Sequence, residues 1–393
     1  MSQGPLDQLH GVRIAHLIES DGPGGAERIV VSLATALQAA GAQNVAILPA
    51  GGEGWLTREL AGTGVAVEHY HLDRPVSPAF ARSLEFTLRR HKVHIAHSHE
   101  FTMAVYGFWA AKRAGIAHLI TMHGSRYYAE RLRRRLALRL AVSWSDHVIA
   151  VSRQLAAHLT RDLWLRPSRV GTIPNAVHLD VAQRSSLRAE LGLRDGERLV
   201  VAIGNLYPVK GHEHLLEAFA ILADRFPMLH VAIAGRGERE GALLARATEL
   251  RLQDRFHLLG LRSDVPNLLG AADVFVLPSL SEGLPLALLE AMMARRPIVA
   301  TDVGEVSVAL AGGTAGVLVK PAEAPALAVA IAHLLTDSSE ARRLGDAAGR
   351  RAAAEYALST MVERYASLYM EMLGKVRRRQ QRSHLRGQVA VIK

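Results

Sequence analysis

Apolar residues gather in short runs along the chain, and between these runs they recur at helical spacing. The first run, residues 12–18, leads into a glycine-rich loop at residues 22–25. The apolar positions of residues 29–37 then fall on one face of a helix, and a second apolar run follows at residues 45–48. The order of strand, glycine loop, helix and strand predicts a parallel βαβ unit.

The same alternation runs through both halves of the chain. In the first half, further strands are expected at residues 65–67, 95–97, 119–122 and 148–151. In the second half, strands are expected at residues 199–203, 231–234, 256–259, 274–277 and 298–300, with helices between them. Runs of Val, Ile and Leu without polar alternation are typical of strands buried on both faces, as in parallel sheets. The pattern therefore predicts an α/β fold with two doubly wound domains.

The chain is long enough for two domains. Its 393 residues exceed the size at which a single core stops growing, and 49% of them are hydrophobic. A turn at Pro174 and the polar stretch after it separate the two patterns. We expect an N-terminal domain at residues 1–180 and a C-terminal domain at residues 181–374, whose last helix packs back on the first domain. A basic tail follows at residues 375–393.

Net charge is distributed unevenly along the chain. Residues 1–180 hold 20 Lys and Arg against 14 Asp and Glu, residues 181–374 hold 20 against 23, and residues 375–393 hold 7 against none. The positive excess therefore lies in the first domain and the tail. A nucleic-acid binder usually presents one continuous basic face, so this division argues against nucleic acid and favours an anionic membrane surface as a partner of the first domain.

The sequence carries no sign of export. Its start lacks the basic-then-apolar pattern of a signal peptide, and no apolar run reaches the roughly 18 residues of a spanning helix. The chain has no cysteine, which excludes disulfides and thiolate metal sites and fits a reducing compartment. We expect a cytoplasmic protein, soluble or peripheral at the cytoplasmic face of a membrane.

Ligands of open α/β sheets bind beyond the carboxyl ends of the strands, so the loops there are the candidate sites. In the first loop, Gly24 and Gly25 precede a helix, where free N–H groups can hold an anion, although a tight turn explains them equally well. Two later strand ends carry histidines. His97 fits a hydrogen-bonded packing residue, whereas His123 precedes Gly124, where the backbone can approach a substrate closely.

The loop of residues 204–211 places Lys210 directly before a helix. A point charge beside free N–H donors suits a diphosphate, and a solvated loop lysine is the alternative. The loop is not a Walker A motif, because Gly-x-x-x-x-Gly-Lys-Ser/Thr is absent.

Two carboxylates lie eight positions apart in the segment of residues 278–292. Glu282 follows a strand, and Glu290 lies about two turns further along, on an otherwise apolar helix. Because burying an unpaired carboxylate is costly, we expect Glu290 to accept hydrogen bonds from a ribose or sugar diol. A salt bridge to Arg295 or Arg296 is the alternative.

In these residues the chain resembles the retaining glycosyltransferase family 4. Its members have the GT-B fold, in which two Rossmann-like doubly wound domains face each other across a cleft. The resemblance extends from Gly11 to about Met372 and rests on the Glu-x7-Glu signature of Glu282 and Glu290. The neighbouring residues that also match are Pro278, Ser279, Gly283, Pro285, Ala291 and Met292.

The resemblance implies a role for each matching position. Glu282 would contact the donor sugar, Glu290 the ribose hydroxyls, and Lys210 the donor diphosphate. The Gly24-Gly25 loop would face the diphosphate across the cleft, and His123 would lie beside the anomeric carbon. The implied catalytic residues are His123, Lys210 and Glu282. The implied donor-binding residues are Gly24, Gly25, Asn205, Lys210, Arg236, Glu282, Gly283, Leu284 and Glu290.

Three positions depart from the family pattern. Asn205 stands where the family usually has an Arg paired with the lysine, so the diphosphate is expected either to be held less strongly or to be held by another cation such as Arg236. Val308 replaces the acid of the usual Gly-Gly-x-Pro-Glu pattern, and Ala176 stands where glycine is common. The sequence explains neither of these two.

The resemblance implies retaining transfer of a sugar from a nucleoside-diphosphate sugar to the hydroxyl of a glycan or lipid-linked acceptor, as in the synthesis of a surface polysaccharide. No Asp-x-Asp motif occurs, so we expect metal independence and no cofactor besides the substrate. Two alternatives are an epimerase or glycosyl phosphorylase on the same fold, and a non-catalytic subunit that binds sugar nucleotides.

The segment of residues 127–140 has Leu132, Leu136 and Leu140 on one helical stripe, flanked by arginines. Such a helix can lie at an anionic membrane interface, and a core stripe with a solvated basic face is the alternative. Together with the basic tail, it would hold the protein reversibly at a membrane.

Overall fold

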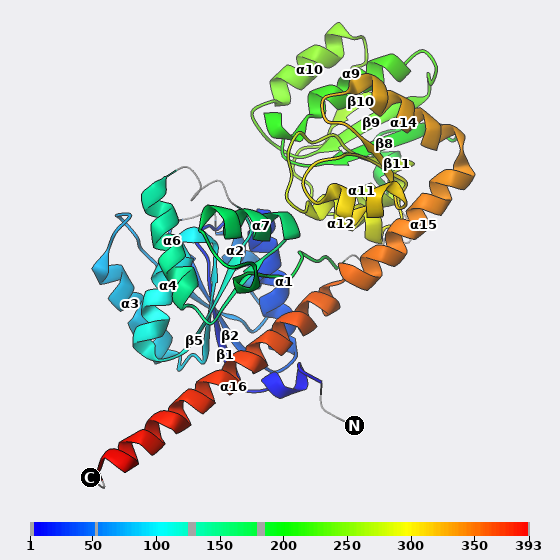
Figure 1. Ribbon diagram of the computed structural model, residues 1–393. Helices are drawn as coiled ribbons and strands as arrows, with labels where there is room; N and C mark the ends of the chain where they lie inside the picture. Colours follow the sequence, from blue (N-terminus) through cyan, green and yellow to red (C-terminus); the bar gives the residue numbers. More distant parts are fainter. Residues whose placement is uncertain (1–3, 52–53, 125–130, 179–184, 392–393) are drawn as a thin grey trace. The chain divides into compact units, whose positions relative to one another are not determined.

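The computed structural model describes residues 4–51, 54–124, 131–178 and 185–391. The chain forms two compact units, the first made of Met1–Asn175 with Leu358–Lys393 and the second of Ala176–Ala357. In each unit, helices cover both faces of a parallel sheet (Figure 1). This confirms the α/β fold with two Rossmann-like domains that the apolar runs predicted.

The first unit contains a sheet of seven strands in the order β3-β2-β1-β4-β5-β6-β7, and each neighbouring pair is parallel. The strands are β1 (Arg13–Leu17), β2 (Gln43–Pro49), β3 (Ala66–Tyr70), β4 (Ile95–His99), β5 (Ala117–Met122), β6 (His147–Ala150) and β7 (Gly171–Thr172). The helices are α1 (Gly25–Ala39), α2 (Trp55–Leu60), α3 (Pro78–Arg90), α4 (Glu100–Ala114), α6 (Leu132–Trp144), α7 (Arg153–Asp162) and α16 (Leu358–Val391).

The second unit contains a sheet of six strands in the order β10-β9-β8-β11-β12-β13, again with parallel neighbours. The strands are β8 (Arg198–Ile203), β9 (Leu229–Ala234), β10 (Phe256–Leu258), β11 (Val274–Leu277), β12 (Ile298–Thr301) and β13 (Val317–Val319). The helices are α8 (Leu187–Glu190), α9 (His212–Leu222), α10 (Glu240–Glu249), α11 (Val265–Ala271), α12 (Leu286–Met293), α13 (Val306–Ala309), α14 (Ala324–Thr336) and α15 (Ser338–Glu355).

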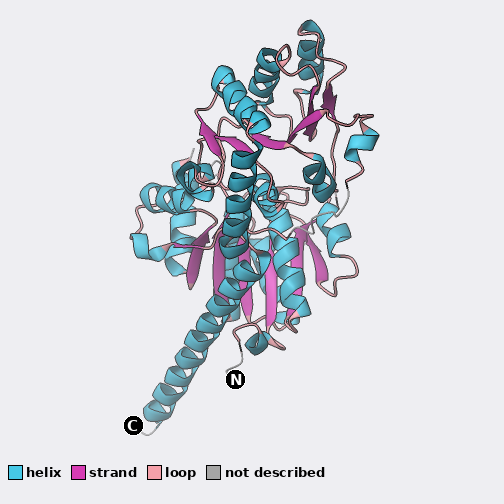
Figure 2. Cartoon of the chain, turned by 90° about the vertical axis from the view of Figure 1, so that its right-hand side faces the viewer, coloured by secondary structure: helices cyan, strands magenta, loops and turns pink. Residues whose placement is uncertain are grey.

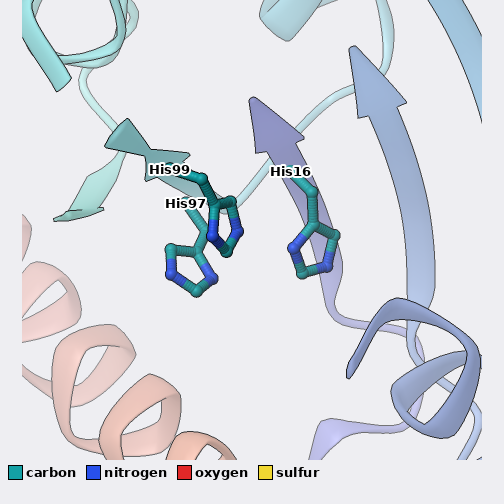
Figure 3. A group of neighbouring side chains, drawn as sticks. All are labelled: His16, His97 and His99. Carbon is teal, nitrogen blue, oxygen red and sulfur yellow. The ribbon is translucent and has the colours of Figure 1, made fainter. Parts of the chain in front are cut away.

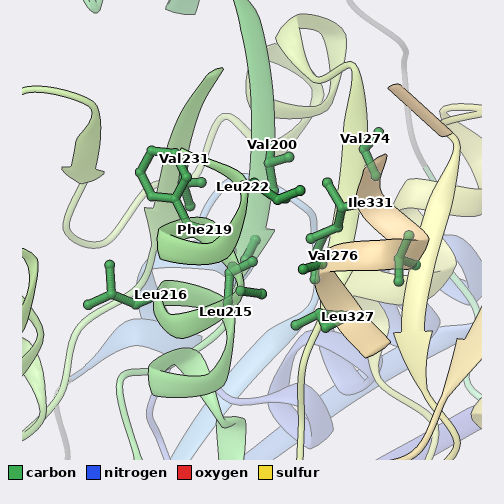
Figure 4. Packing of buried hydrophobic residues seen from close by; sticks show 14 of the residues in the cluster. Val200, Leu215, Leu216, Phe219, Leu222, Val231, Val274, Val276, Leu327 and Ile331 are labelled. Atoms are coloured by element: carbon green, nitrogen blue, oxygen red, sulfur yellow. The ribbon is translucent and has the colours of Figure 1, made fainter. Parts of the chain in front are cut away.

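The core of the second unit shows why its strands carry continuous apolar runs. On one face of the sheet, Phe219 of α9 and Ile331 of α14 pack with Val200 of β8 and Val276 of β11 (Figure 4). A separate cluster covers the other face, where Val201 is buried. Because both faces are covered, successive residues of β8 are buried regardless of the side to which they point.

Helix α16 belongs to the first unit, where it runs past the strands (Figure 2). The sequence pattern counted residues 358–374 with the second domain while expecting their helix to pack on the first. The structure places them in the first unit because Tyr365, Tyr369 and Met372 are buried there. Among the described residues, no helix combines the length and apolar character needed to cross a membrane.

Candidate active site

The order of strands reverses at one point in each sheet. In the second unit β8 is followed along the chain by β9 on one side, while β11 lies on its other side. In the first unit the same reversal falls between β1 and β4. Loops that leave neighbouring strands in opposite directions open a crevice beyond their carboxyl ends, and ligands of doubly wound folds bind there.

Two loops meet at the reversal point of the second sheet. The loop after β8 ends in a short 3₁₀ helix at Pro208–Lys210, and the backbone N–H of Leu280, after β11, donates to the carbonyl of Val209 at 2.8 Å. Gly211 has φ of +61°, and a Cβ there would lie 2.2 Å from the carbonyl oxygen of Pro278. Only glycine permits both this conformation and this approach.

The contact of the loops brings Lys210 and Glu282 together. Lys210 Nζ lies 2.7 Å from Glu282 Oε1, and the hydroxyl of Ser279 donates to the same oxygen at 2.7 Å. The Glu282 side chain is only 8% exposed, so the ammonium and the hydroxyl compensate the burial of its charge. The pair presents one cation and one carboxylate where the ligand of this fold is expected.

A third loop holds Glu282 in place from the side of β12. Thr301 Oγ1 donates to the carbonyl of Ser279 at 2.6 Å, and the N–H of Glu305 donates to the carbonyl of Gly283 at 3.0 Å. A Cβ on Gly304, which has φ of +58°, would lie 2.1 Å from the Glu282 carbonyl oxygen. The loop that carries the Glu282 carboxylate is thus held on one side by the loop after β8 and on the other side by β12 and the loop after it.

The remaining donor-binding candidates of this unit lie on the neighbouring loops and on α12. Glu290 is partly buried in α12 between buried Leu289 and Ala291, and Leu284 is buried ahead of the helix while Gly283 is exposed. The two arginines suggested as alternative partners of Glu290 make contacts elsewhere. Arg295 pairs with Asp346 at 3.2 Å, and Arg296 Nε donates to the carbonyl of Ala294 at 2.9 Å.

Asn205 and Arg236 lie on loops that touch. The N–H of Leu206 donates to the carbonyl of Arg236 at 2.9 Å, and a Cβ on Gly235 would lie 2.0 Å from the Gly204 carbonyl oxygen. Both Asn205 and Arg236 are exposed. The structure therefore brings the backbone of Arg236 beside the position at which the family usually carries an arginine.

In the first unit, Gly24 is the N-cap of α1. A Cβ on Gly24 would lie 2.3 Å from Glu27 Oε2, and the hydroxyl of Ser20 donates to Glu27 Oε1. The chain's own carboxylate therefore already complements this helix start, where the sequence pattern predicted room for a bound anion.

His123 directly follows β5. Its Nε2 lies 3.1 Å from His99 Nδ1, and its backbone N–H donates to Glu100 Oε1 at 3.1 Å. Burial lowers the pKa of His123 to about 4 and raises the pKa of Glu100 to about 8. At pH 7 His123 is therefore a neutral imidazole, able to donate or accept a hydrogen bond without carrying charge.

His97 is buried and hydrogen-bonded at both ring nitrogens, as the packing interpretation of this residue predicted. Its Nδ1 lies 2.7 Å from the Tyr369 hydroxyl, and its Nε2 lies 2.8 Å from the Thr121 hydroxyl. Burial holds the pKa of His97 well below the usual range.

Sequence reasoning missed His16, Glu100 and the pairing of His99 with His123. One signal for His16 was present, since it interrupts the first apolar run of the chain. The register that sets His16 beside His97 of the neighbouring strand is a tertiary feature. His16, His97 and His99 come together from β1 and β4 (Figure 3).

Comparison with known proteins places both halves in one family. Residues 183–351 match the family model of glycosyl transferases group 1, and residues 23–181 match that of glycosyltransferase family 4. The chain is 32% identical over 238 residues to the UDP-Gal:alpha-D-GlcNAc-diphosphoundecaprenol alpha-1,3-galactosyltransferase of Escherichia coli, covering 56% of this chain and 61% of that protein. It is 30% identical over 287 residues to the alpha-D-kanosaminyltransferase of Streptomyces kanamyceticus, covering 68% and 74% respectively.

Solved structures share the fold over nearly the full chain. A glycosyltransferase from Rickettsia africae aligns with a TM-score of 0.83 at 21% identity, covering 92% of this chain and 99% of that one. The Anabaena protein Alr3699/HepE, solved in complex with UDP-glucose, aligns with a TM-score of 0.78 at 23% identity, covering 91% and 99%. The chain therefore belongs to glycosyltransferase family 4 and has its GT-B fold.

Proposed function

We propose that the protein transfers a sugar from a nucleoside-diphosphate sugar to an acceptor hydroxyl with retention of the anomeric configuration. The Lys210–Glu282 pair at the strand reversal of the second sheet carries this proposal, because it offers a cation for a diphosphate and a carboxylate for sugar hydroxyls. Membership of the family supports the same activity.

In the proposed reaction, the bond between the anomeric carbon and the diphosphate oxygen breaks, and its electron pair stays with the diphosphate. Lys210 stabilises the growing negative charge, and Arg236 supplies the second cation in place of the usual arginine. The departing phosphate oxygen takes the proton of the acceptor hydroxyl on the same face, and the new glycosidic bond forms there. We propose that this charge stabilisation needs no metal ion at the diphosphate.

The other site residues bind and orient the donor in this proposal. Glu282 accepts hydrogen bonds from the sugar hydroxyls, and Glu290 accepts two from the ribose. Leu284 and Gly283 line the loop beside Glu282. In the first unit, the proposal assigns His123 the role of a neutral hydrogen-bonding group.

The function is tested first by a thermal-shift screen of UDP, GDP and ADP sugars. The sugar nucleotides with one of the three bases should stabilise the protein by about 2.7 kcal/mol when the ligand concentration is a hundred times the dissociation constant. Product analysis with and without a glycan acceptor follows. A glycoside that forms only with acceptor supports the proposal. An epimer or sugar phosphate formed without acceptor favours the alternative enzymes, and binding without turnover or hydrolysis favours a non-catalytic subunit.

The apolar stripe of α6 is exposed, so the core-stripe alternative is wrong. Leu132, Leu136, Leu140 and Trp144 recur every four residues and are 50–62% exposed, whereas the buried face of the helix is formed by Leu138 and its neighbours. Residues recurring every four positions share one side of a helix.

Basic groups lie around this stripe. Lys112 Nζ lies 3.9 Å from the centre of the Trp144 ring, and the guanidinium groups of Arg135 and Arg139 lie over the ring of Trp164 at 4.6 and 5.7 Å. Trp164 is itself 52% exposed. An apolar stripe bordered by cations has the chemistry of an anionic membrane interface.

We therefore propose that α6 and the basic tail hold the protein reversibly at the anionic cytoplasmic face of a membrane, and that the acceptor is a lipid-linked glycan. The Escherichia coli relative, whose name gives a diphosphoundecaprenol-linked acceptor, supports this choice. The tail after residue 374 adds 7 Lys and Arg.

Replacing Leu132, Leu136 and Leu140 by serine should release the protein from anionic vesicles, since each buried leucine contributes about 1.5–3 kcal/mol to partition. Co-sedimentation measures the bound fraction. A chain ending at Gly374 should bind less tightly and with a weaker dependence on salt. Leu244→Ser, at a leucine of α10 that is 46% exposed, is the control. Equal binding of all variants to anionic and neutral vesicles would contradict the proposal and favour a soluble acceptor.

A further inference from the structure

Three histidine side chains meet in the interior of the first unit. His16 comes from β1, and His97 and His99 come from the neighbouring β4; all three are fully buried. Their ring centres are 5.6 Å apart for His16 and His97, 4.1 Å for His97 and His99, and 5.9 Å for His16 and His99 (Figure 3). One ring nitrogen from each histidine lies within 4.8 Å of those of the other two.

Two nitrogens of this cluster lack a hydrogen bond. Within the described part of the chain, neither His16 Nδ1 nor His99 Nε2 has a partner, although each atom is buried. An unsatisfied buried polar atom costs free energy, and native proteins almost always supply a partner for it. Two such atoms, both belonging to one small group of imidazoles, suit a species that binds nitrogen lone pairs.

The hydrogen bonds of the other nitrogens are compatible with free lone pairs in the cluster. His16 Nε2 lies 3.1 Å from the side-chain oxygen of Asn44, so it carries the hydrogen and leaves Nδ1 as a lone pair. The amide nitrogen of Asn44 donates to Gln38 Oε1 at 3.2 Å, which fixes that orientation. His99 Nδ1 lies 3.1 Å from His123 Nε2, and when His99 Nδ1 donates to His123 Nε2, His99 Nε2 is left as a lone pair.

His97 can supply a third lone pair. When Nδ1 donates a hydrogen bond to the Tyr369 hydroxyl at 2.7 Å, Nε2 carries the lone pair and accepts a hydrogen bond from the Thr121 hydroxyl at 2.8 Å. A metal ion would displace only the Thr121 bond. Thr121 would keep a partner, because its hydroxyl also lies 3.2 Å from the Tyr365 hydroxyl.

We propose that His16 Nδ1, His97 Nε2 and His99 Nε2 bind one divalent transition-metal ion, for which zinc is the best match. Three neutral imidazoles are a known zinc ligand set, and the other ring nitrogen of each ligand here has an outer hydrogen-bond partner that can fix the orientation of the ring. Those partners are Asn44, Tyr369 and His123. Because zinc–nitrogen bonds measure about 2.0–2.1 Å, the rings must close slightly around the ion.

The ion would have a structural role. It would join β1 to β4 at the strand reversal of the first sheet and, through His97 and Tyr369, connect them to α16. All three ligands lie in the first unit and the test measures metal binding directly, so the proposal stands whether or not the proposed glycosyl transfer is correct.

The test uses the full chain, freed of metal by a chelator and then titrated with Zn²⁺ or Co²⁺. One equivalent of Zn²⁺ should bind by calorimetry and raise the melting temperature, and Co²⁺ should give the visible absorption of nitrogen-ligated cobalt. His16→Gln keeps a donor toward Asn44 and removes Nδ1, and His99→Asn keeps a polar group near Nδ1 and removes Nε2. Each should weaken Zn²⁺ binding by more than about tenfold, since even changes to outer partners cost 10–100-fold.

The control is His118→Gln. His118 is also buried, but its nitrogens pair with the hydroxyls of Ser98 at 2.8 Å and Ser145 at 2.7 Å. This variant should be less stable yet keep the Zn²⁺-dependent rise in melting temperature. It therefore distinguishes a loss of folding stability from a loss of metal binding. His230→Ala removes the stacked pair with His257, another place where metal could bind.

Absence of Zn²⁺ and Co²⁺ binding by the unchanged chain would overturn the proposal and leave water as the occupant. Binding that survives in His16→Gln and His99→Asn but disappears in His230→Ala would overturn it as well, because the ion would then lie in the second unit.

Discussion

Lys210→Ala should lower kcat by about 10²–10³-fold, the range seen when one preorganised partner of a developing negative charge is removed. The donor dissociation constant should change much less, because the charge on the leaving diphosphate is greatest near the transition state. Steady-state kinetics gives kcat, and calorimetry with the intact donor in the absence of acceptor gives the dissociation constant.

The ion pair complicates this variant, and two controls resolve it. Lys210→Ala leaves the largely buried Glu282 carboxylate without its cation, so some loss could come from a displaced loop. Lys210→Ala combined with Glu282→Gln removes that charge and is compared with Glu282→Gln alone; if the displaced loop were the cause, these two variants would turn over equally. Arg236→Ala tests the second cation. Near-normal turnover in Lys210→Ala with complete loss in Arg236→Ala would show that Arg236, and not Lys210, stabilises the leaving group.

Glu290→Ala should weaken donor binding by about a hundredfold. Two hydrogen bonds from ribose hydroxyls to one carboxylate together contribute about 3 kcal/mol, at the lower end of the range for hydrogen bonds to charged groups. Each 1.4 kcal/mol changes the affinity about tenfold. The interaction exists before and during the reaction, so kcat/KM should fall by the same factor while kcat changes little. Calorimetry with the nucleoside diphosphate alone measures the effect without any contribution from the sugar.

A ligand change provides the matched control for Glu290. The 2′-deoxy nucleotide should bind more weakly than the ribonucleotide to the unchanged protein, whereas Glu290→Ala should bind both equally. Glu249→Ala, an exposed helix glutamate paired with Arg246, should leave both affinities unchanged. An unaltered dissociation constant in Glu290→Ala would contradict the ribose assignment.

Local sequence was sufficient for the type of the elements that apolar runs mark, but it did not predict β13. Runs such as residues 199–203 and 274–277 are apolar at every position, and only a strand covered on both faces satisfies such a run. The loops after these strands could also be identified, because glycine, lysine and glutamate directly follow the apolar runs. The fold class was therefore predicted correctly, whereas the role of the candidate loops stays a prediction.

The order of the strands required the tertiary structure. Lys210 and Glu282 are separated by 71 intervening residues, and they form an ion pair because β11, rather than β9 alone, lies beside β8. Likewise, His16 meets His97 because β1 pairs with β4 in that register. Hydrophobic periodicity is a local property and carries no information on which strand becomes the neighbour of which.

The apolar stripe on α6 likewise has one property that local sequence determines and one that only the tertiary structure determines. Helical spacing alone determined that Leu132, Leu136 and Leu140 share one face, because that follows from 3.6 residues per turn. Whether that face is covered depends on the elements packed around the helix, and the structure leaves it exposed. The sequence by itself determined the elements that apolar runs and helical spacing mark, and the residues at their ends. Tertiary packing alone decided which of those residues meet and which remain in solvent, because both depend on contacts between segments far apart in the chain.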